Sequence, residues 1–313
     1  MRDHHDIVRM YRHRLSACFV LATLLCAGLT ISAAAGDAQF VPIDVPGAQE
    51  TIASGINTRG DIAGYWFDRS ASKFRGFALL AGSFSLIDIP DAAATQAFGI
   101  NAHRHIVGAY ADAAQTFHGF VLAGDHVQTI DVPGARHSSA LGINARGEIV
   151  GQYFDTDDFS LGHGFLLTGG RVTPIDVPGA RSTTASGISA SGVVVGFYHD
   201  GDADALNDVH GFMRGVHGDF TTIDVPNGTN TVVSGINSHG EIVGFFTGSD
   251  FRVHGFVLAD GLFTTVNVPQ AGNTFALGIN DRGQIAGDFV EVGGPTHGFV
   301  TAKHGDANGA RGK

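Results

Sequence analysis

Cysteine is almost absent from this sequence. The two cysteines, Cys18 and Cys26, both lie near the N-terminus, so the rest of the chain has no thiol for a disulfide, for catalysis or for a cysteine-based zinc site. Charged residues make up only 16% of the 313 residues, and the net charge is −11. An acidic chain with scattered Lys and Arg is a poor binder of nucleic acid, because phosphate neutralisation needs a cationic surface. We expect no nucleic-acid partner.

Regular helices and familiar catalytic motifs are also missing. Outside the N-terminal segment no long stretch has the 3.6-residue apolar period of a helix. The chain contains no G-x-S-x-G, no P-loop and no H-E-x-x-H, which argues against the enzyme classes that depend on them. The acid pair of a glycoside hydrolase stays open, because residues paired in space need not be close in sequence.

The N-terminus has the pattern of a secretory signal. Four arginines (Arg2, Arg9, Arg12 and Arg14) precede an apolar run that ends in Ala33-Ala34-Ala35. We predict a signal peptide over residues 1–35, cleaved after Ala35, and a secreted or periplasmic protein with no membrane insertion after cleavage. The alternative is an uncleaved anchor, since the run is about long enough to span a bilayer. Residues 304–313 are expected to form a flexible tail.

What dominates the remaining sequence is a repeat. The tripeptide Gly-Ile-Asn occurs six times and begins at Gly55, Gly99, Gly142, Gly187, Gly235 and Gly278, with spacings of 44, 43, 45, 48 and 43 residues. Ser189 replaces the Asn in the fourth copy. Each copy divides into four strand-like pieces, named A to D; in the fifth copy they are 231–236, 241–246, 254–258 and 263–268. The sequence predicts an all-β, six-bladed propeller of four-stranded antiparallel blades over residues 36–303.

Turn and proline positions order the strands. An Asn-x-x-Gly turn joins A to B, with Arg104 replacing the Gly in the second copy. Pro42 and Pro174 fall inside strand D, and proline within a strand is confined mainly to edges, so D is predicted as the outer edge and A as the innermost strand. The first D strand (40–45) precedes the first A strand, and the last copy ends after C. The N-terminal strand should therefore complete the last blade and close the ring.

These motifs resemble the bacterial extracellular HAF repeat family. That family pairs a similar Gly-Ile-Asn stretch with His-Ala-Phe, whereas the middle residue here is Gly in every copy: Gly76 (after Arg75), Gly119, Gly164, Gly211, Gly255 and Gly298. The resemblance covers all six copies and implies a secreted repeat protein. It implies no catalytic residues.

The His of His-Gly-Phe is the obvious metal-ligand candidate: His118, His163, His210, His254 and His297. Zinc needs ligands converging at about 2.0–2.1 Å, and strand-C residues of different blades should be too far apart for that. We predict a structural role, with hydrogen bonds to a neighbouring strand or loop. The same role is expected for the acid of Ile-Asp-Val-Pro (Asp44, Asp88, Asp131, Asp176, Asp224, with Asn267 in the sixth copy). Packing between blades is expected for the strand-B aromatics (Trp66, Tyr110, Tyr153, Tyr198, Phe246, Phe289).

Length variation points to one face of the ring. The gaps from the strand-B aromatic to the strand-C His or Arg are 9, 8, 10, 12, 8 and 8 residues, so insertions fall almost entirely in the B–C loops. Because strand directions alternate, the B–C and D–A loops share a face, and variable loops on a rigid scaffold are where binding sites usually lie. The predicted ligand-binding residues are Gln49, Glu50, Asp68, Asp112, Arg136, His137, Asp155, Asp157, Arg181, Asp250 and Glu291.

The longest B–C loop, 199–208, has the D-x-D-x-D spacing of calcium loops, with Asp200, Asp202, Asp204 and Asp208 as candidate ligands. It lacks the loop glycine and the twelfth-position acid, so weak calcium binding competes with a simple solvated acidic loop. No other cofactor is expected.

The function favoured by these patterns is a non-catalytic binding or structural module. Its partner would be an unknown extracellular ligand, a glycan or a protein, and the chain would be a monomer. The alternative is an extracytoplasmic propeller enzyme, a hydrolase or lyase acting on carbohydrate. An acid pair with a raised pKa in the channel mouth would favour the enzyme.

Overall fold

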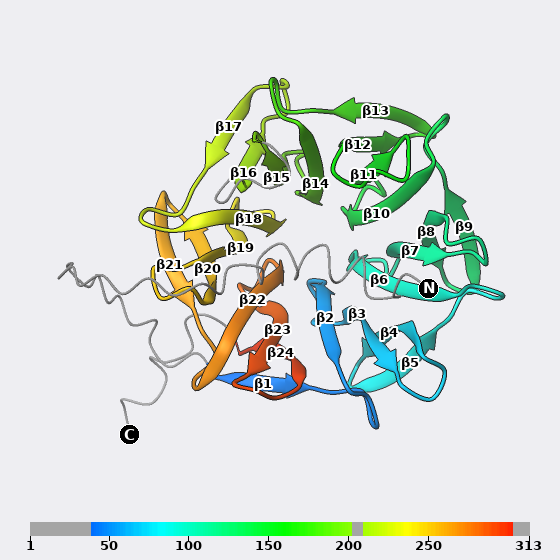
Figure 1. The fold of residues 1–313 in the computed structure, drawn as a ribbon, viewed down its shortest axis with the longest axis horizontal. Helices are drawn as coiled ribbons and strands as arrows, with labels where there is room; N and C mark the ends of the chain where they lie inside the picture. Colours follow the sequence, from blue (N-terminus) through cyan, green and yellow to red (C-terminus); the bar gives the residue numbers. More distant parts are fainter. Residues whose placement is uncertain (1–38, 202–208, 303–313) are drawn as a thin grey trace. The chain divides into compact units, whose positions relative to one another are not determined.

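The computed structural model describes residues 39–201 and 209–302, which form six four-stranded antiparallel sheets arranged in a ring (Figure 1). The predicted signal peptide, the tail and Asp202, Asp204 and Asp208 lie outside the described residues. Within residues 39–201 and 209–302, no helix is long and apolar enough to cross a membrane.

Each sheet is one blade, and its strands occur in the order A, B, C, D from the centre of the ring outward (Figure 1). The A strands are β2 (Thr51–Ile56), β6 (Ala94–Ile100), β10 (His137–Ile143), β14 (Ser182–Ile188), β18 (Thr229–Ile236) and β22 (Ala271–Ile279). The B strands are β3 (Ile62–Asp68), β7 (Ile106–Ala111), β11 (Ile149–Phe154), β15 (Val194–His199), β19 (Ile242–Thr247) and β23 (Ile285–Glu291). The C strands are β4 (Lys73–Leu80), β8 (Phe117–Ala123), β12 (Gly162–Thr168), β16 (Val209–Arg214), β20 (Val253–Ala259) and β24 (Thr296–Thr301). The D strands are β5 (Ser83–Ile87), β9 (His126–Ile130), β13 (Arg171–Ile175), β17 (Phe220–Ile223), β21 (Leu262–Val266) and β1 (Phe40–Ile43).

Ring closure follows the predicted scheme. Blades 1 to 5 are each built from four consecutive strands, starting with β2–β5, whereas blade 6 combines β22, β23 and β24 with β1 from the N-terminal end. β1 pairs antiparallel with β24, from Phe40 opposite Thr301 to Ile43 opposite Gly298. Pro42 and Pro174 both lie in outermost strands, β1 and β13, as strand chemistry requires. The six-bladed propeller and its N-terminal clasp are confirmed.

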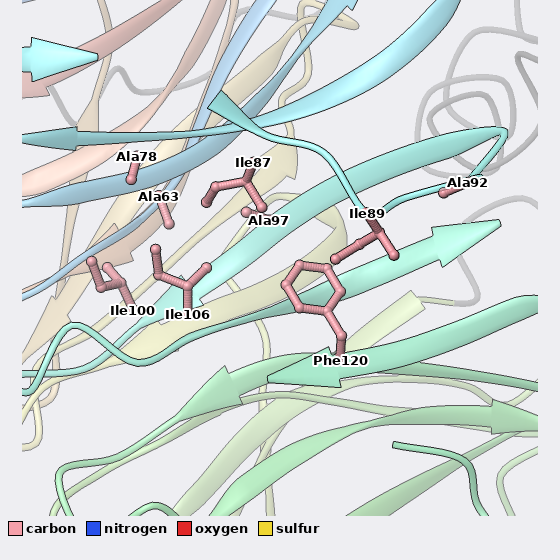
Figure 2. Packing of buried hydrophobic residues seen from close by; sticks show 9 residues of the cluster. All are labelled: Ala63, Ala78, Ile87, Ile89, Ala92, Ala97, Ile100, Ile106 and Phe120. Atoms are coloured by element: carbon pink, nitrogen blue, oxygen red, sulfur yellow. The ribbon is translucent and has the colours of Figure 1, made fainter. Parts of the chain in front are cut away.

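The Phe of each His-Gly-Phe is the central core residue of its blade. All six are essentially buried: Phe77, Phe120, Phe165, Phe212, Phe256 and Phe299. Each ring packs over a strand-B glycine; a Cβ on Gly108, for example, would lie 2.6 Å from the Phe120 ring and 2.1 Å from the Gln96 carbonyl oxygen. Around Phe120 the core extends between blades 1 and 2, with Ile87, Ile89 and Ile106 among its members (Figure 2).

The middle Gly of His-Gly-Phe is explained by strand D. A Cβ on Gly164 would lie 2.5 Å from the Ile175 carbonyl oxygen, and the equivalent contact at Gly298 to the Ile43 oxygen is 2.7 Å. Real Cβ atoms do not approach backbone oxygen so closely, so the Ala of the HAF motif would force strand D away from strand C.

The repeated Gly-Ile-Asn builds the inner wall of the ring. A Cβ on Gly55 would meet Gly99 Cα at 3.0 Å, and the series continues around the ring until Gly278 meets Gly55 Cα at 3.2 Å. These six glycines therefore let the innermost strands of adjacent blades pack backbone against backbone.

The Asn of this motif has two roles. Its side chain caps the A–B turn: Asn57 Oδ1 accepts from the backbone N–H of Arg59 at 2.9 Å and of Asp61 at 3.0 Å. In addition, Asn57 Nδ2 donates to the Asn101 carbonyl of the next blade at 3.1 Å, and the series closes with Asn280 Nδ2 donating to Asn57 O at 2.8 Å. The shorter Ser189 makes no such bond to blade 5 in the described part of the chain. The Asn thus links neighbouring blades as well as capping its own turn.

Candidate ligand-binding face

The B–C and D–A loops lie on the same face, as the alternation of strands predicts. In blade 2, His118 contacts both loops: its Nδ1 is 2.9 Å from Asp131 Oδ1 in the D–A connection, and its Nε2 is 3.6 Å from Asp112 Oδ2 in the B–C loop. We call this side of the ring the B–C face, and the side that carries the Asn-x-x-Gly turns the A–B face.

The His118 arrangement recurs in blades 2 to 6. Each His ring lies against the strand-B aromatic, as in the stacking of His118 on Tyr110 with centroids 5.1 Å apart. Each Nδ1 contacts the Asp or Asn of the D–A connection: Asp131, Asp176, Asp224, Asn267 and Asp44. In four blades Nε2 also faces a B–C acid: Asp112, Asp200, Asp250 and Glu291. The predicted hydrogen bonds between the repeated His and a neighbouring strand or loop are therefore present. Among the described residues no cluster of three or more His, Cys, Asp or Glu could hold a metal.

In blade 1, cations replace the histidine. Arg75 contacts Asp68 through Nε at 2.8 Å and also forms an ion pair with Asp88, which Lys73 Nζ approaches to 3.0 Å. Hydrogen bonds from Ser70 and Arg75 lower the pKa of Asp68 to about 2. Asp68 is therefore ionised and internally bonded at any physiological pH.

His137 of blade 3 is a buried exception among the predicted site residues. Its Nδ1 accepts from the backbone N–H of Phe117 in blade 2 at 3.1 Å, and its Nε2 donates to Asp157 Oδ1 at 2.9 Å. Burial lowers the pKa of His137 more than the Asp157 carboxylate raises it, so the ring is neutral with its proton on Nε2. Asn273 makes the equivalent contact between blades 5 and 6, where its Oδ1 accepts from the Val253 N–H at 2.9 Å. His137 is thus an interblade cap rather than a free base.

The other predicted residues form separate contacts around the rim. Arg136 Nε lies 3.2 Å from Asp157 Oδ1, the same oxygen that His137 contacts. Arg181 Nη2 donates to Ser160 Oγ at 2.9 Å. Glu50 bridges to Thr296 through the backbone, while Gln49 and Asp155 are exposed. The structure brings Arg136, His137 and Asp157 together and distributes the remainder over different blades.

The structure adds a feature that charge and loop length did not indicate: exposed apolar tips on three B–C loops, Leu161, Phe251 and Val292. Phe251 is 82% exposed and has φ of +60°, a conformation that a bulky residue rarely adopts. Its loop is tightly bonded: Phe251 N–H donates to Gly248 O at 3.0 Å, and Gly248 N–H donates to Arg252 O at 2.9 Å. An aromatic residue within the otherwise polar Ser-Asp-Phe-Arg loop was the available sequence signal.

Three carboxyls of this face, Asp112, Asp157 and Asp250, have pKa values suited to accepting hydrogen bonds rather than to donating a proton. Hydrogen bonds hold the pKa of Asp112, Asp157 and Asp250 below its ordinary value, in Asp250 despite partial burial. A general acid needs a raised pKa. These three groups are hydrogen-bond acceptors at neutral pH.

The exposure of its hydrogen-bond partners limits the contribution of the repeated His to stability. For His254→Ala we expect a loss below about 1 kcal/mol, because Asp250 at 51% exposure and the exposed Asn267 regain water. Urea unfolding checks this, with His254→Gln as the control that keeps a polar side chain. A loss above about 2 kcal/mol, or loss of a stoichiometric metal, would contradict the exposed hydrogen-bonding role.

Comparison with known proteins supports the fold. No family model and no curated protein sequence matches the chain. Solved structures do: the β-propeller domain of the Trilobed protease from Pyrococcus furiosus (TM-score 0.52, 10% identity, covering 83% of this chain and 85% of that one), a gluconolactonase from Xanthomonas campestris (0.51, 12%, 85% and 90%) and the Aleuria aurantia lectin in complex with Fucα1-6GlcNAc (0.51, 12%, 83% and 98%). The first is described as having an open velcro topology, whereas β1 and β24 pair here. At these identities the likeness shows the propeller fold alone.

Proposed function

We propose that this chain is a secreted or periplasmic, non-catalytic propeller that binds an extracellular glycan on its B–C face. The observation that carries the proposal is Phe251, an aromatic ring held in solvent by a hydrogen-bonded loop at the cost of a left-handed backbone. Strained residues that persist on a rigid loop commonly mark ligand contacts.

A sugar ring fits this loop chemically. The C–H face of a pyranose can stack on the exposed Phe251 ring, while its hydroxyls can donate to ionised carboxylates such as Asp250. Asp250 Oδ1 accepts from His254 Nε2 at 2.9 Å and from Arg252 N–H at 3.1 Å, which fixes its position before a ligand arrives. Because His, aromatic and acid recur around the rim, weak contacts in several blades could add through multivalency.

Two further observations support a binding role. The similar structures include a fucose-binding lectin of the same fold, and the resemblance to the extracellular HAF repeats favours secretion. The lowered pKa values of Asp112, Asp157 and Asp250 disfavour the hydrolase or lyase alternative, since none of these three can hold a proton for transfer at neutral pH.

Phe251→Gly should separate binding from stability. Gly adopts φ of +60° without strain, so we expect unchanged or slightly higher stability, by up to about 1 kcal/mol, together with at least a tenfold loss of glycan affinity. A glycan array identifies the ligand, and calorimetry of wild type and variant measures the loss.

The matched control is Leu262→Ala, which removes an exposed apolar side chain from the start of β21, next to the C–D turn of the same blade on the opposite face. Equal affinity of wild type and Phe251→Gly would disprove the role of Phe251. Turnover of the bound glycan into cleaved product would replace the binding module by the enzyme.

A further inference from the structure

The A–B face carries a ring of arginine and histidine side chains, interspersed with carboxylates of the same turns. The third residue of each Asn-x-x-Gly turn is basic or imidazole in five of six blades: Arg59, His103, Arg146, His239 and Arg282, with Ser191 in the fourth. All five are exposed. Arg146 pairs with Glu148, whereas Arg59 and Arg282 form no ion pair with another described residue.

An internal carboxylate already occupies one place in this ring. Asp281, the second residue of the blade 6 turn, accepts a hydrogen bond through Oδ1 from the backbone N–H of Ser238, the second residue of the blade 5 turn, at 2.8 Å. The contact crosses the interface between two blades. It shows that the N–H of this turn position binds a carboxylate presented from the neighbouring turn.

The equivalent place is open at two other interfaces, 1/2 and 2/3. Between blades 1 and 2, Ala102 stands where Asp281 stands, and the Thr58 N–H has no hydrogen bond within the described chain. Between blades 2 and 3, Ala145 stands there beside the Ala102 N–H. The Asn57 and Asn101 side-chain bonds, both 3.1 Å, hold these turns side by side in the same way as Asn237 holds the turns of blades 5 and 6. Arg59, His103 and Arg146 border the two open places.

We propose that the A–B face is a second binding surface, specific for a carboxylated polysaccharide. Sugar carboxylates would take, at the 1/2 and 2/3 interfaces, the place that Asp281 takes at the 5/6 interface, with Arg59 and Arg146 supplying charge-assisted hydrogen bonds and His103 a further ring N–H. The surface is distinct from the B–C face and does not depend on the function proposed for it.

Neither a protein partner nor a second copy fits this surface as well. The exposed large apolar residues lie on B–C loops, D strands and C–D turns, so the A–B turns lack the apolar centre of a protein interface. The acids of the B–C face lie beside the outer C and D strands, whereas the cations lie at the innermost turns, so stacked rings would not bring them together. A hydrophilic polyanion needs neither condition.

The test is binding of polygalacturonate to the immobilised protein, with the neutral methyl ester as the uncharged probe. We expect the ionised polygalacturonate to bind and its methyl ester not to bind. Affinity should fall at least about tenfold from 0.1 M to 1 M NaCl, because the screening length shortens from about 10 Å to about 3 Å.

Opposite variants sharpen the test. Ala102→Asp copies the Asp281 arrangement and blocks the 1/2 interface, so affinity should fall at least fivefold, whereas Asp281→Ala opens the 5/6 interface and should raise it. Ala113→Asp makes the same charge change on an exposed B–C loop and should alter affinity less than twofold. If Ala102→Asp does not fold, as judged by melting, Arg59→Gln with Arg146→Gln takes its place.

Equal weakening by Ala102→Asp and Ala113→Asp would reduce the effect to net charge and overturn the site. Failure of wild type to bind polygalacturonate, or equal binding of its methyl ester, would overturn the carboxylate specificity. Phe251→Gly should leave this binding unchanged, so the two proposals fail independently.

Discussion

Removal of residues 39–46 should open the ring and cost the protein most of its stability. These residues include β1, the only strand of blade 6 that comes from the other end of the described chain. Ile43 is 5% exposed and packs with Ala53, Ile62 and Phe77 of blade 1, so β1 joins the first blade to the last. Phe40 packs edge-on against Phe299 at 5.4 Å. Loss of Ile43 alone should cost about 2–5 kcal/mol, a large part of a typical total of 5–15.

Thermal melting and size-exclusion chromatography measure the result, since the unpaired edge of β24 should also promote aggregation. Two point variants on the same strand provide the internal comparison. Ile43→Ala should destabilise strongly, whereas Val41→Ala, at 45% exposure, should change stability by less than about 1 kcal/mol. A synthetic peptide of residues 39–46 should partly restore the melting temperature of the truncated chain. A monomeric truncated protein that melts with the full chain would show that β1 does not hold the ring.

Much of this fold could be predicted because the sequence aligns with itself. Six copies show which residues recur, and two prolines inside strand D were enough to place that strand at the edge. One D strand precedes the first copy and one is missing from the last copy. The N-terminal D strand was therefore expected to complete the last blade and close the ring. The cap formed by Asn57 on its own turn was predictable for the same reason, since it joins residues four or fewer apart.

Contacts across blade interfaces were not predictable in the same way. Repetition marks Asn57 as important but does not reveal that its Nδ2 reaches the carbonyl of Asn101, because that depends on the angle between blades. The candidate site shows the same limit. A carboxylate such as Asp112 that caps its own loop looks identical in sequence to one that is available to a ligand. Phe251 was overlooked because the face was predicted from charge and loop length, whereas its signal is an apolar side chain exposed by backbone conformation.

Arg104 breaks the repeat, because it replaces the Gly of the A–B turn in the second copy. The structure explains the replacement. The other five equivalent turns all have Gly with positive φ here, and Arg104 has φ of +65°. Its guanidinium binds the Asp61 carboxylate of blade 1 in a bidentate pair, with Nε–Oδ2 at 2.8 Å and Nη2–Oδ1 at 3.1 Å. Asp61 is only 4% exposed, against 41% for Arg104. Burial raises the pKa of Asp61, but hydrogen bonds from Arg104 and Asn57 and the charge of Arg104 outweigh it, so the pKa lies below its ordinary value.

The effect of Arg104→Gly on stability should therefore have opposite signs in the wild type and in an Asp61→Asn background. In the wild type the substitution relieves about 1 kcal/mol of left-handed strain but leaves a buried carboxylate without its cation, so we expect a net loss of about 2 kcal/mol. In an Asp61→Asn background, where the side chain is uncharged like the equivalent Gln284 of blade 6, the same substitution should stabilise by about 0.5–1 kcal/mol. Urea unfolding of the four proteins at pH 7 gives the complete cycle.

Acidification supplies an independent check on the same pair. A carboxyl with a depressed folded-state pKa contributes stability above its unfolded pKa and loses it as pH falls through the folded value. Without Arg104 the buried Asp61 should instead have a raised pKa and take up its proton first. The stability difference between wild type and Arg104→Gly should shrink as the pH is lowered from about 6 toward 4, where an Asp begins to protonate. A constant difference across this range, or destabilisation of the Asp61→Asn protein by Arg104→Gly, would mean that Arg104 acts through packing and not through the Asp61 charge.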